Sequence, residues 1–160
     1  MSGTERKTFT VGRTFKASPE KVWAMLTTRE GLDRWWAPEG FRSVVQHLDV
    51  RVGGRFEIAM TAVLPEIVAH LKALGVPATS VARGDYTEVQ ANRRLAYRNA
   101  IDFVPGVAPY TTETLIEMSP APGGGTRLVV TNDVMHDATW TENARRGWEQ
   151  QIGKLEKSLG

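Results

Sequence analysis

The sequence predicts an α+β fold in which a curved antiparallel sheet wraps around one long C-terminal helix. Three observations lead to this prediction. Apolar and polar residues alternate through much of residues 41–136, as in strands with one buried face. From about residue 138 to 159, apolar residues recur at steps of three and four, as in a long amphipathic helix. Residues 19–36, which follow the first strand, carry the signals of two short helices.

The chain is expected to begin with a flexible segment, residues 1–7, followed by a single domain over residues 8–160. The first residues, MSGTERK, are polar and contain no apolar signal region. A length of 160 residues suits one compact domain. The first strand is expected in TFTVGRTFK, whose alternate residues are apolar, a register that also turns Arg13 inward.

Two short helices are expected after this strand. Ser18 can cap a helix that begins with Pro19 and continues to about Thr27. Thr27 and Glu30 have the spacing of a capping box, so we expect a second helix to start there. This helix should stop before Pro38, because the residue before a proline disfavours helical geometry.

Two adjacent tryptophans, Trp35 and Trp36, close the second helix. On a helix they share one face with Leu32, whereas on a strand they would point to opposite faces. Core packing is the simplest role for them, but tryptophan is seldom fully buried and its indole N–H needs a partner. We therefore expect one ring to lie in the core and the other to border a cavity.

Six further strands are expected between the short helices and the C-terminal helix. They are predicted at residues 43–52, 55–63, 84–90, 92–103, 110–118 and 126–136. The inward rows are expected to contain Phe56, Ile58, Met60, Leu95, Tyr97, Asn99, Ile101, Phe103, Leu128, Val130, Asn132, Val134 and His136. The apolar stripe of the C-terminal helix is Trp140, Ala144, Trp148, Ile152, Leu155 and Leu159.

An extra helix is expected near residues 65–74, inserted between two strands. Its apolar residues are Ile67, Val68, Leu71 and Leu74, with Gly75 as a stop. A helix of ~10 residues is marginal alone, so this stripe needs an apolar partner. Two interpretations stay open: residues 64–80 form a mobile lid at the cavity mouth, or the helix is fixed packing at the end of the core.

The composition argues against several kinds of site. Twenty basic and eighteen acidic residues leave a formal net charge of +2 without a sustained basic stripe, so no nucleic acid partner is expected. The chain has no cysteine, and its three histidines are scattered. Phosphate-loop, GxSxG and dinucleotide motifs are missing, so we expect neither a metal nor another cofactor. No apolar run reaches the ~18 residues that cross a bilayer, and we expect a cytoplasmic protein without membrane insertion.

Seven segments of the sequence resemble the START-like helix-grip superfamily, also called SRPBCC. Within it, the chain is similar to the family named for the activator of the heat-shock-protein-90 ATPase. The segments are ASPEKVW at 17–23, LDRWWAP at 32–38, VGGRFEIAM at 52–60, GDYTEV at 84–89, RRLAY at 93–97, GTRLVVT at 125–131 and GWEQQIGKLEKSL at 147–159. Their joint order carries the resemblance. The helix near 65–74 departs from the family's usually shorter strand connection.

The resemblance implies a deep, mostly apolar cavity. Superfamily members bind lipids, hormones, polyketides and other hydrophobic molecules, and some are cyclases. We therefore expect binding, for carriage or sensing, of a small hydrophobic or aromatic ligand. The residues expected to bind it are Trp35, Trp36, Phe56, Ile58, Met60, Leu71, Tyr97, Asn99, Ile101, Phe103, Thr114, Asn132, His136, Trp140 and Trp148.

Two other functions stay open. One is a co-chaperone-like module that binds a protein, although the asparagine- and tryptophan-rich motif of the eukaryotic activators' additional domain is not found in this sequence. The other is a cyclase or hydrolase acting on a hydrophobic substrate, but the residues favour no enzymatic activity and no catalytic residue is assigned.

Three polar residues have alternative roles. Asn99 and Asn132 interrupt apolar rows, and a buried amide needs a hydrogen-bond partner. Each either bonds a neighbouring backbone group or orients a ligand together with Thr114 or Tyr97. His136 stands where the last strand meets the helix, either as a general base or pH-sensitive contact, or bonded to its neighbour at the helix start.

Overall fold

Seven antiparallel strands form one sheet in the computed structural model, which describes residues 7–159. Their order across the sheet is β1-β7-β6-β5-β4-β3-β2. The strands are β1 Thr8–Phe15, β2 Phe41–Leu48, β3 Arg55–Ala62, β4 Thr79–Gln90, β5 Arg94–Ile101, β6 Tyr110–Ala121 and β7 Gly125–Asp133. The predicted flexible segment 1–7 lies outside the described residues, except for Lys7.

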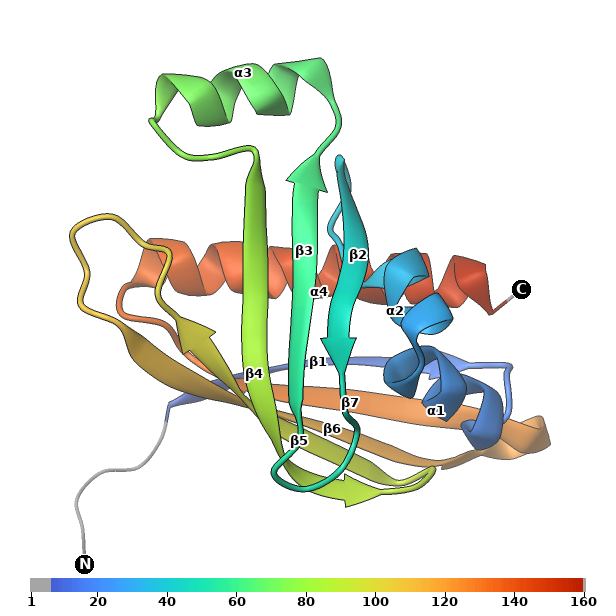
Figure 1. Ribbon diagram of the computed structural model, residues 1–160. Coiled ribbons are helices and arrows are strands. Elements are labelled where there is room, and N and C mark those ends of the chain that lie inside the picture. The colour runs from blue at the N-terminus through green and yellow to red at the C-terminus, as the bar shows by residue number, and fades with distance from the viewer. Residues whose placement is uncertain (1–6, 160) are drawn as a thin grey trace, which may run out of the picture.

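The described residues also form four α-helices. They are α1 Pro19–Thr27, α2 Arg29–Trp35, α3 Pro65–Ala73 and α4 Ala138–Ser158, and a short 3-10 turn, η1 Pro122–Gly124, joins β6 to β7. Figure 1 shows α4 running along the inner face of a strongly bent sheet, with α1 and α2 at one end. This arrangement confirms the predicted α+β helix-grip fold, including the extra helix between β3 and β4.

The bend divides the sheet into two parts. In Figure 1, β2, β3 and the first part of β4 run across the direction of β1, β6 and β7. A bulge between Tyr86 and Glu88 interrupts the pairing of β4 with β5. Bulges increase local twist and bend a strand. The bulge therefore helps the sheet to fold around α4.

The second short helix is capped by a different threonine from the one predicted. Thr28 has extended backbone geometry, and its hydroxyl accepts a hydrogen bond from the backbone N–H of Gly31 at 3.1 Å. Thr27 ends α1 instead, and its hydroxyl donates to the carbonyl oxygen of Trp23. The expected capping box of Thr27 and Glu30 is therefore wrong by one residue, because α1 keeps Thr27.

Two strands are longer than predicted. β4 begins at Thr79 rather than near Gly84, because Thr79 pairs with Thr61 of β3. β6 continues to Ala121 rather than ending near Met118, because β7 pairs with it up to that residue. In both cases the neighbouring strand supplies hydrogen bonds that the residues' own turn propensity does not predict.

Three other strands end two or more residues earlier than predicted. β2 stops at Leu48, β5 at Ile101 and β7 at Asp133. The pairing partners end there: Asp133 lies opposite Thr8, the first residue of β1. Phe103 and His136, which were expected at the ends of inward rows, consequently lie in the segments that follow β5 and β7.

Helix α2 covers the edge strand β2. Arg29 donates to the carbonyl oxygen of Val45, and Asp33 accepts a 2.8 Å hydrogen bond from the N–H of the same residue. The hydroxyl of Ser43 lies 3.2 Å from the carbonyl oxygen of Leu32. An exposed edge strand invites pairing with another chain. These bonds occupy part of the edge and fix α2 on the sheet.

Aromatic rings fill the centre of the core. We call this group the aromatic cluster; it consists of Trp35, Trp36, Phe56, Tyr86, Tyr97 and Trp148. The rings of Phe56 and Tyr97 meet edge to face, with centroids 5.2 Å apart. Gly84 leaves room for this packing, since a Cβ there would overlap the Phe56 ring and the carbonyl oxygen of Arg98.

Helix α4 packs against β1 and α2 through its central and C-terminal turns. Its first turn is capped by Asp137, which accepts a hydrogen bond from the N–H of Trp140 at 2.8 Å. Its buried apolar residues are Trp148, Ile152 and Leu155. Arg13 of β1 turns toward the helix, as predicted, and its guanidinium lies 3.2 Å from the carboxylate of Glu156.

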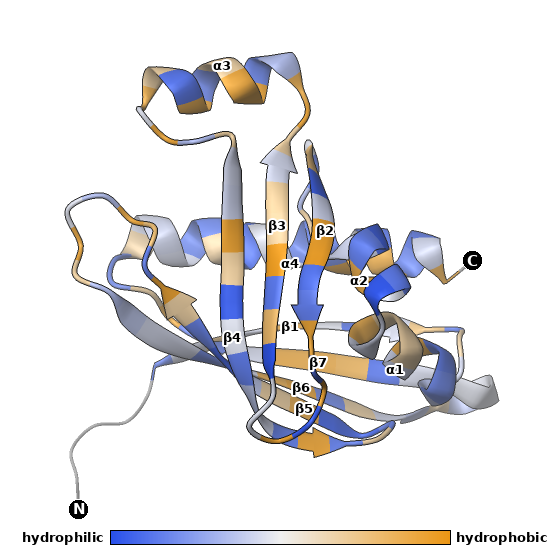
Figure 2. Ribbon diagram, viewed as in Figure 1, coloured by the Kyte–Doolittle hydropathy of each residue, from blue (hydrophilic) through white to orange (hydrophobic). Residues whose placement is uncertain are grey.

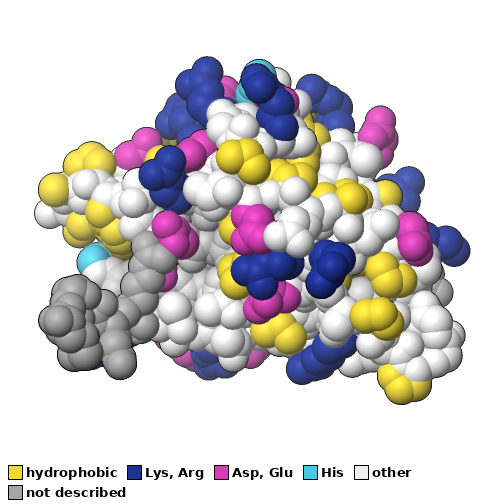
Figure 3. Space-filling view, turned by 90° about the horizontal axis from the view of Figure 1, so that it is seen from below, with side chains coloured by type: hydrophobic (Ala, Val, Ile, Leu, Met, Phe, Trp, Pro, Cys, Tyr) yellow, Lys and Arg dark blue, Asp and Glu magenta, His cyan; other side chains and the backbone are white. Residues whose placement is uncertain are grey.

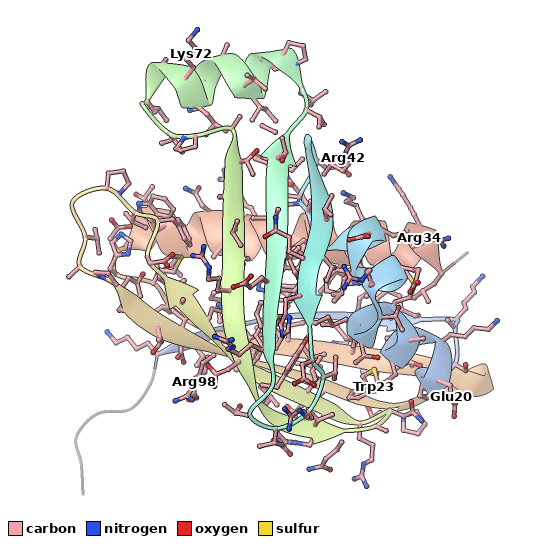
Figure 4. The ribbon with its side chains drawn as sticks, in the orientation of Figure 1. Glu20, Trp23, Arg34, Arg42, Lys72 and Arg98 are labelled. Carbon is pink, nitrogen blue, oxygen red and sulfur yellow. The ribbon has the colours of Figure 1, made fainter. Side chains whose placement is uncertain are left out.

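Helix α3 stands beyond the ends of β3 and β4 (Figure 1). None of its residues is buried, although Figure 2 shows apolar residues on it as well as along β3, β4 and β7. Ile67 packs over Gly40, where a Cβ would overlap its side chain. Leu74 is 61% exposed, and Lys72 points away from the sheet (Figure 4). The helix therefore contributes little to the core.

The outer face of the sheet carries basic and acidic side chains intermixed, as Figure 3 shows from below. Arg94 lies 2.9 Å from Glu88 and 2.7 Å from Glu117, and Arg98 lies 2.7 Å from Asp85. Such half-exposed pairs add little stability.

In the described part of the chain, no helix is long and apolar enough to span a membrane.

Candidate functional site

A cavity of about 450 Å³ lies between α4 and the inner face of the sheet. Ligand pockets in proteins typically measure about 300–1,000 Å³. The cavity is lined by Trp36, Pro38, Phe41, Met60, Ala82, Arg83, Tyr97, Asn99, Ala100, Ile101, Phe103, Thr112, Thr114, Asn132, Met135, Trp140, Asn143, Ala144, Gly147, Trp148 and Gln151. Strands β3 to β7, the segment after α2 and one face of α4 therefore all contribute to its wall.

Helix α4 leaves this volume unfilled because its cavity-facing side carries small residues between large ones. Trp140, Ala144, Gly147 and Trp148 follow one another at helical spacing on the face that lines the cavity. A Cβ added to Gly147 would have no atom within 4 Å, so this position faces open space. Ala144 and Gly147 are thus where the helix and the sheet fail to fill the volume between them.

The sheet contributes a neutral polar patch, which consists of Asn99, Thr112, Thr114 and Asn132. The Nδ2 of Asn99 donates to the hydroxyl of Thr114 at 2.8 Å and to that of Thr112 at 3.3 Å. The hydroxyl of Thr114 donates in turn to Oδ1 of Asn132, whose Nδ2 lies 3.2 Å from the carbonyl oxygen of Asp133. The patch is thus internally hydrogen-bonded, as buried amides require.

The phenol of Tyr97 lies beside this patch without a hydrogen bond. Its Oη is buried, and it is the only such side-chain atom without a partner among residues 7–159. Burial raises the pKa of Tyr97 well above its ordinary value; the charge of the nearby Tyr86 adds to the rise, and a polar contact with the Thr114 hydroxyl offsets part of it. The phenol is therefore protonated at neutral pH and carries a proton to donate.

Aromatic side chains cluster at one end of the cavity; we call Phe103, Tyr110, His136 and Trp140 the aromatic rim, of which Phe103 and Trp140 line the cavity. Trp140 lies between Phe103 and His136, with centroid separations of 6.1 and 5.7 Å. The Tyr110 hydroxyl lies 2.7 Å from Nδ1 of His136, whose Nε2 lies 3.6 Å from the carboxylate of Asp137. His136 is therefore held at the rim by its neighbours and does not line the cavity.

The chemistry of the wall is neutral. Among the lining residues that the structure describes, Arg83 alone is charged. Its guanidinium lies 3.5 Å from Asp102 and 3.7 Å from Glu57. Within residues 7–159, no group of three or more histidine and carboxylate side chains is placed to hold a metal ion. The wall is suited to contact with apolar surface and to a few neutral hydrogen bonds.

The sequence of residues 16–160 matches the family model described as Activator of Hsp90 ATPase homolog 1-like protein. The chain belongs to this family. Similar solved structures include protein CV1439 from Chromobacterium violaceum, with 26% identity and a TM-score of 0.77 over 95% of this chain and 96% of that chain. No curated protein matches the chain.

Two further solved structures extend the comparison. Protein NE0264 from Nitrosomonas europaea is 25% identical, with a TM-score of 0.71 over 95% of this chain and 93% of that one. The AHSA1 protein from Silicibacter pomeroyi is 20% identical, with a TM-score of 0.73 over 96% and 97% of the two chains. At this identity the likeness to the Silicibacter pomeroyi protein concerns the fold alone. This family member thus shares its fold with bacterial proteins along nearly the whole chain.

Most residues that the sequence predicts as ligand-binding lie in the cavity wall of this family member. They are Trp36, Met60, Tyr97, Asn99, Ile101, Phe103, Thr114, Asn132, Trp140 and Trp148. Of the adjacent tryptophans, Trp35 is in the core and Trp36 borders the cavity. The indole N–H of Trp35 finds its partner in the carbonyl oxygen of Met25, at 2.7 Å.

Five predicted residues lie elsewhere. Trp35, Phe56 and Ile58 surround a core void of only about 10 Å³, which has room for no more than one water molecule. Leu71 is on α3, outside the cavity wall, and His136 belongs to the aromatic rim. Phe56 and Ile58 share a strand face with Met60, but they lie deeper, where the aromatic cluster fills the space.

Several lining residues were not predicted. On α4 they are Asn143, Ala144, Gly147 and Gln151, whose spacing from Trp140 and Trp148 places them on the same helix face. Thr112 precedes Thr114 by one strand period, so alternation alone would have placed it on the inward row. Small and neutral side chains of this kind do not stand out in a sequence. Only helical spacing on α4 and alternation along β6 could have identified them.

Proposed function

We propose that the chain binds a small hydrophobic or aromatic molecule in the cavity between α4 and the sheet, for carriage or sensing. The observation that carries this proposal is the composition of the cavity wall. Aromatic and aliphatic side chains surround about 450 Å³, and the neutral polar patch occupies one side. Such a combination favours burial of apolar ligand surface together with a few orienting hydrogen bonds.

The site favours binding over catalysis. The groups of its neutral polar patch are amides and hydroxyls that bond one another, which gives them no acid or base role. His136, the residue best suited to proton transfer, is held in the aromatic rim by Tyr110. A cyclase or hydrolase would need such a group within reach of its substrate.

A cytoplasmic location is part of this proposal, because a chain without cysteine needs no oxidising compartment.

Native mass spectrometry of the protein purified from its own source tests this proposal directly. A co-purified apolar molecule would show as a mass above that of the chain and would identify the ligand class. In parallel, the neutral fluorophore phenylnaphthylamine should bind saturably, with increased emission, to protein freed of endogenous ligand by organic extraction and refolding. Circular dichroism establishes that the extracted protein has refolded.

Gly147 offers a matched pair of variants for this titration. The leucine side chain of Gly147→Leu would extend into open space in the cavity and should weaken phenylnaphthylamine binding about tenfold or more. Gly147→Ala adds one methyl group and should retain binding. Equal affinity of both variants and the wild type would place the fluorophore outside the cavity. Absence of both a co-purified ligand and saturable fluorophore binding would contradict the proposed function.

A second candidate function is engagement of a chaperone. Two observations favour it: the match to the family named for an Hsp90 ATPase activator, and the apolar residues that α3 exposes. Titration against a bacterial heat-shock-protein-90 homologue tests it. Saturable binding with a changed rate of ATP hydrolysis would support this function. An unchanged rate together with no binding would exclude it for that chaperone.

A further inference from the structure

The unpartnered phenol of Tyr97 bears on the chemistry of the ligand. Tyr97 lines the cavity, and its Oη is buried without a hydrogen bond. A buried polar group without a partner is destabilising, and native proteins contain few of them. A molecule bound in the cavity would supply the missing partner. The question is which group of that molecule would meet the phenol.

The ring of Tyr97 is held firmly in place. Its centroid lies 5.2 Å from that of Phe56, 6.0 Å from Tyr86 and 6.2 Å from Trp36. These contacts on several sides of the ring prevent the side chain from swinging out to solvent. The hydroxyl therefore keeps its position in the wall whether or not a ligand is bound.

The neighbouring polar patch has already used much of its own hydrogen-bonding capacity. Thr114 has given its only hydroxyl proton to Asn132. Asn99 directs its Nδ2 to the two threonines of the patch. The donors of Asn99 and Thr114 are therefore already used, whereas Tyr97 still has a proton to give. The phenol of Tyr97 is thus a buried donor without a hydrogen-bond partner.

The charge of the wall limits the ligand further. Arg83, the single charged lining residue in the described structure, already faces Glu57 and Asp102. A charged group on the ligand would lose its hydration in the cavity and would find no free opposite charge there. Burying such an unpaired charge is costly. The group that meets Tyr97 is therefore neutral.

We infer that Tyr97 recognises the ligand by donating a hydrogen bond to an uncharged acceptor, so that the ligand is an apolar or aromatic molecule carrying a carbonyl-type oxygen. This inference rests on the proposed function and names the class of ligand for the same cavity. The aromatic and aliphatic wall buries the body of the molecule. The phenol fixes the end that carries the oxygen.

Two probes of nearly the same shape test the inference. Acetylnaphthalene carries a carbonyl oxygen where isopropenylnaphthalene carries a methylene group. Their affinities are measured by displacement of phenylnaphthylamine. The wild type should bind acetylnaphthalene about fivefold to tenfold more tightly, as expected for one neutral hydrogen bond. Tyr97→Phe should bind both probes with the affinity that the wild type has for isopropenylnaphthalene.

Tyr86→Phe is the matched control. Tyr86 is also buried, and its ring lies 6.0 Å from that of Tyr97, but it does not line the cavity. This variant should keep the preference for acetylnaphthalene. The infrared carbonyl band of bound acetylnaphthalene gives an independent readout. It should move to lower wavenumber in the wild type and return toward its value in an apolar solvent in Tyr97→Phe.

The outcomes separate the inference from the proposed function. If the wild type and Tyr97→Phe bind both probes equally well, the role of Tyr97 is overturned and ligand binding in the cavity stands. If Tyr86→Phe loses the preference as well, the effect arises from packing and the inference also fails. If neither probe displaces the fluorophore and the fluorophore itself does not bind, both the inference and the proposed function fail.

Discussion

The side-chain amide of Gln151 on α4 donates a hydrogen bond to the backbone carbonyl oxygen of Trp36, just after α2. Further bonds link the same two parts of the chain. The ammonium of Lys154 lies 2.7 Å from the carbonyl oxygen of Ala37, and the N–H of Glu39 lies 3.1 Å from Oε1 of Gln150. Helix α4 thus holds residues 36–39 and, through Trp36, one border of the cavity.

Gln151→Leu should lower the free energy of unfolding by about 1–3 kcal/mol, because it leaves the carbonyl oxygen of Trp36 buried and unpaired. Chemical denaturation measures this change. Lys154→Met, which removes a bond that is only partly buried, should cost less than ~1 kcal/mol. Equal costs for both variants would show that the burial of Gln151 is not what makes its bond important.

Trp148→Ala should destabilise the protein by about 3–5 kcal/mol, since Trp148 is buried between α4 and the other rings of the aromatic cluster. Trp140→Ala removes the same side chain from the half-buried rim and should cost clearly less. Thermal and urea unfolding of the two variants compare them directly. A loss of stability for Trp140→Ala as large as that for Trp148→Ala would contradict this packing.

The same substitution should have opposite effects at two glycines. Gly84→Ala should destabilise by about 1–3 kcal/mol, because the new Cβ would overlap the Phe56 ring and the carbonyl oxygen of Arg98. Gly147→Ala should stabilise by about 0.5–1 kcal/mol, because it improves helix propensity at a position that faces open space. Denaturation midpoints that move in the same direction would refute the expected geometry.

Stability should fall at alkaline pH because of two buried phenols. Burial raises the pKa of both Tyr86 and Tyr97 above the ordinary value of 10.0. Above about pH 10 the unfolded chain releases protons that the folded chain keeps, so unfolding becomes easier as pH rises. The loss amounts to at most ~1.4 kcal/mol per pH unit for each tyrosine, and it is not expected below pH 10.

Absorbance of phenolate measures this effect. In a Tyr110→Phe background, Tyr86 and Tyr97 are the remaining tyrosines, since the sequence contains three. Phenolate absorbance should then rise together with the loss of circular dichroism, because these residues ionise only when the chain unfolds. A rise in absorbance that precedes unfolding would show that at least one of the phenols is accessible in the folded protein.

Helix α3 should exchange its amide hydrogens much faster than the central strands. It buries no residue and forms no part of the cavity wall. Binding of phenylnaphthylamine should therefore leave its exchange unchanged. Protection over residues 64–80 that increases with the fluorophore would instead support a lid, and protection equal to that of the central strands would support fixed packing.

The fold was predictable because its two periodicities are clear. Alternation through the strands and the stripe from Trp140 to Leu159 leave one simple solution, a sheet around a helix. The ends of strands were less predictable. Thr79 joins β4 because Thr61 lies opposite it, and this pairing is a property of the tertiary structure. Likewise, the sequence could not show that Thr28 rather than Thr27 caps α2, because the two adjacent threonines have the same capping chemistry.

The cavity wall was predictable where a residue is unusual in its row. Asn99 and Asn132 stand out among apolar neighbours, and they meet in the neutral polar patch. Whether an inward-facing strand residue lies in the packed core or in the cavity wall could not be predicted in this way. Phe56 and Met60 share a face, but the bend of the sheet puts Phe56 in the aromatic cluster. Gly147 went unnoticed because a missing side chain gives no hydrophobic signal.

The pairing of β1 with β7 has a consequence for synthesis on the ribosome. The first strand lies at the edge of the sheet, and β7 is its only neighbouring strand, with Thr8 opposite Asp133. Until β7 has left the exit tunnel, β1 has no strand to bind, and α4, which covers it, emerges later than β7. Closing such a long loop is slow and leaves apolar surface open to chaperones in the meantime. The nascent protein thus completes its sheet only after β7 has emerged, and α4 can cover β1 only after that.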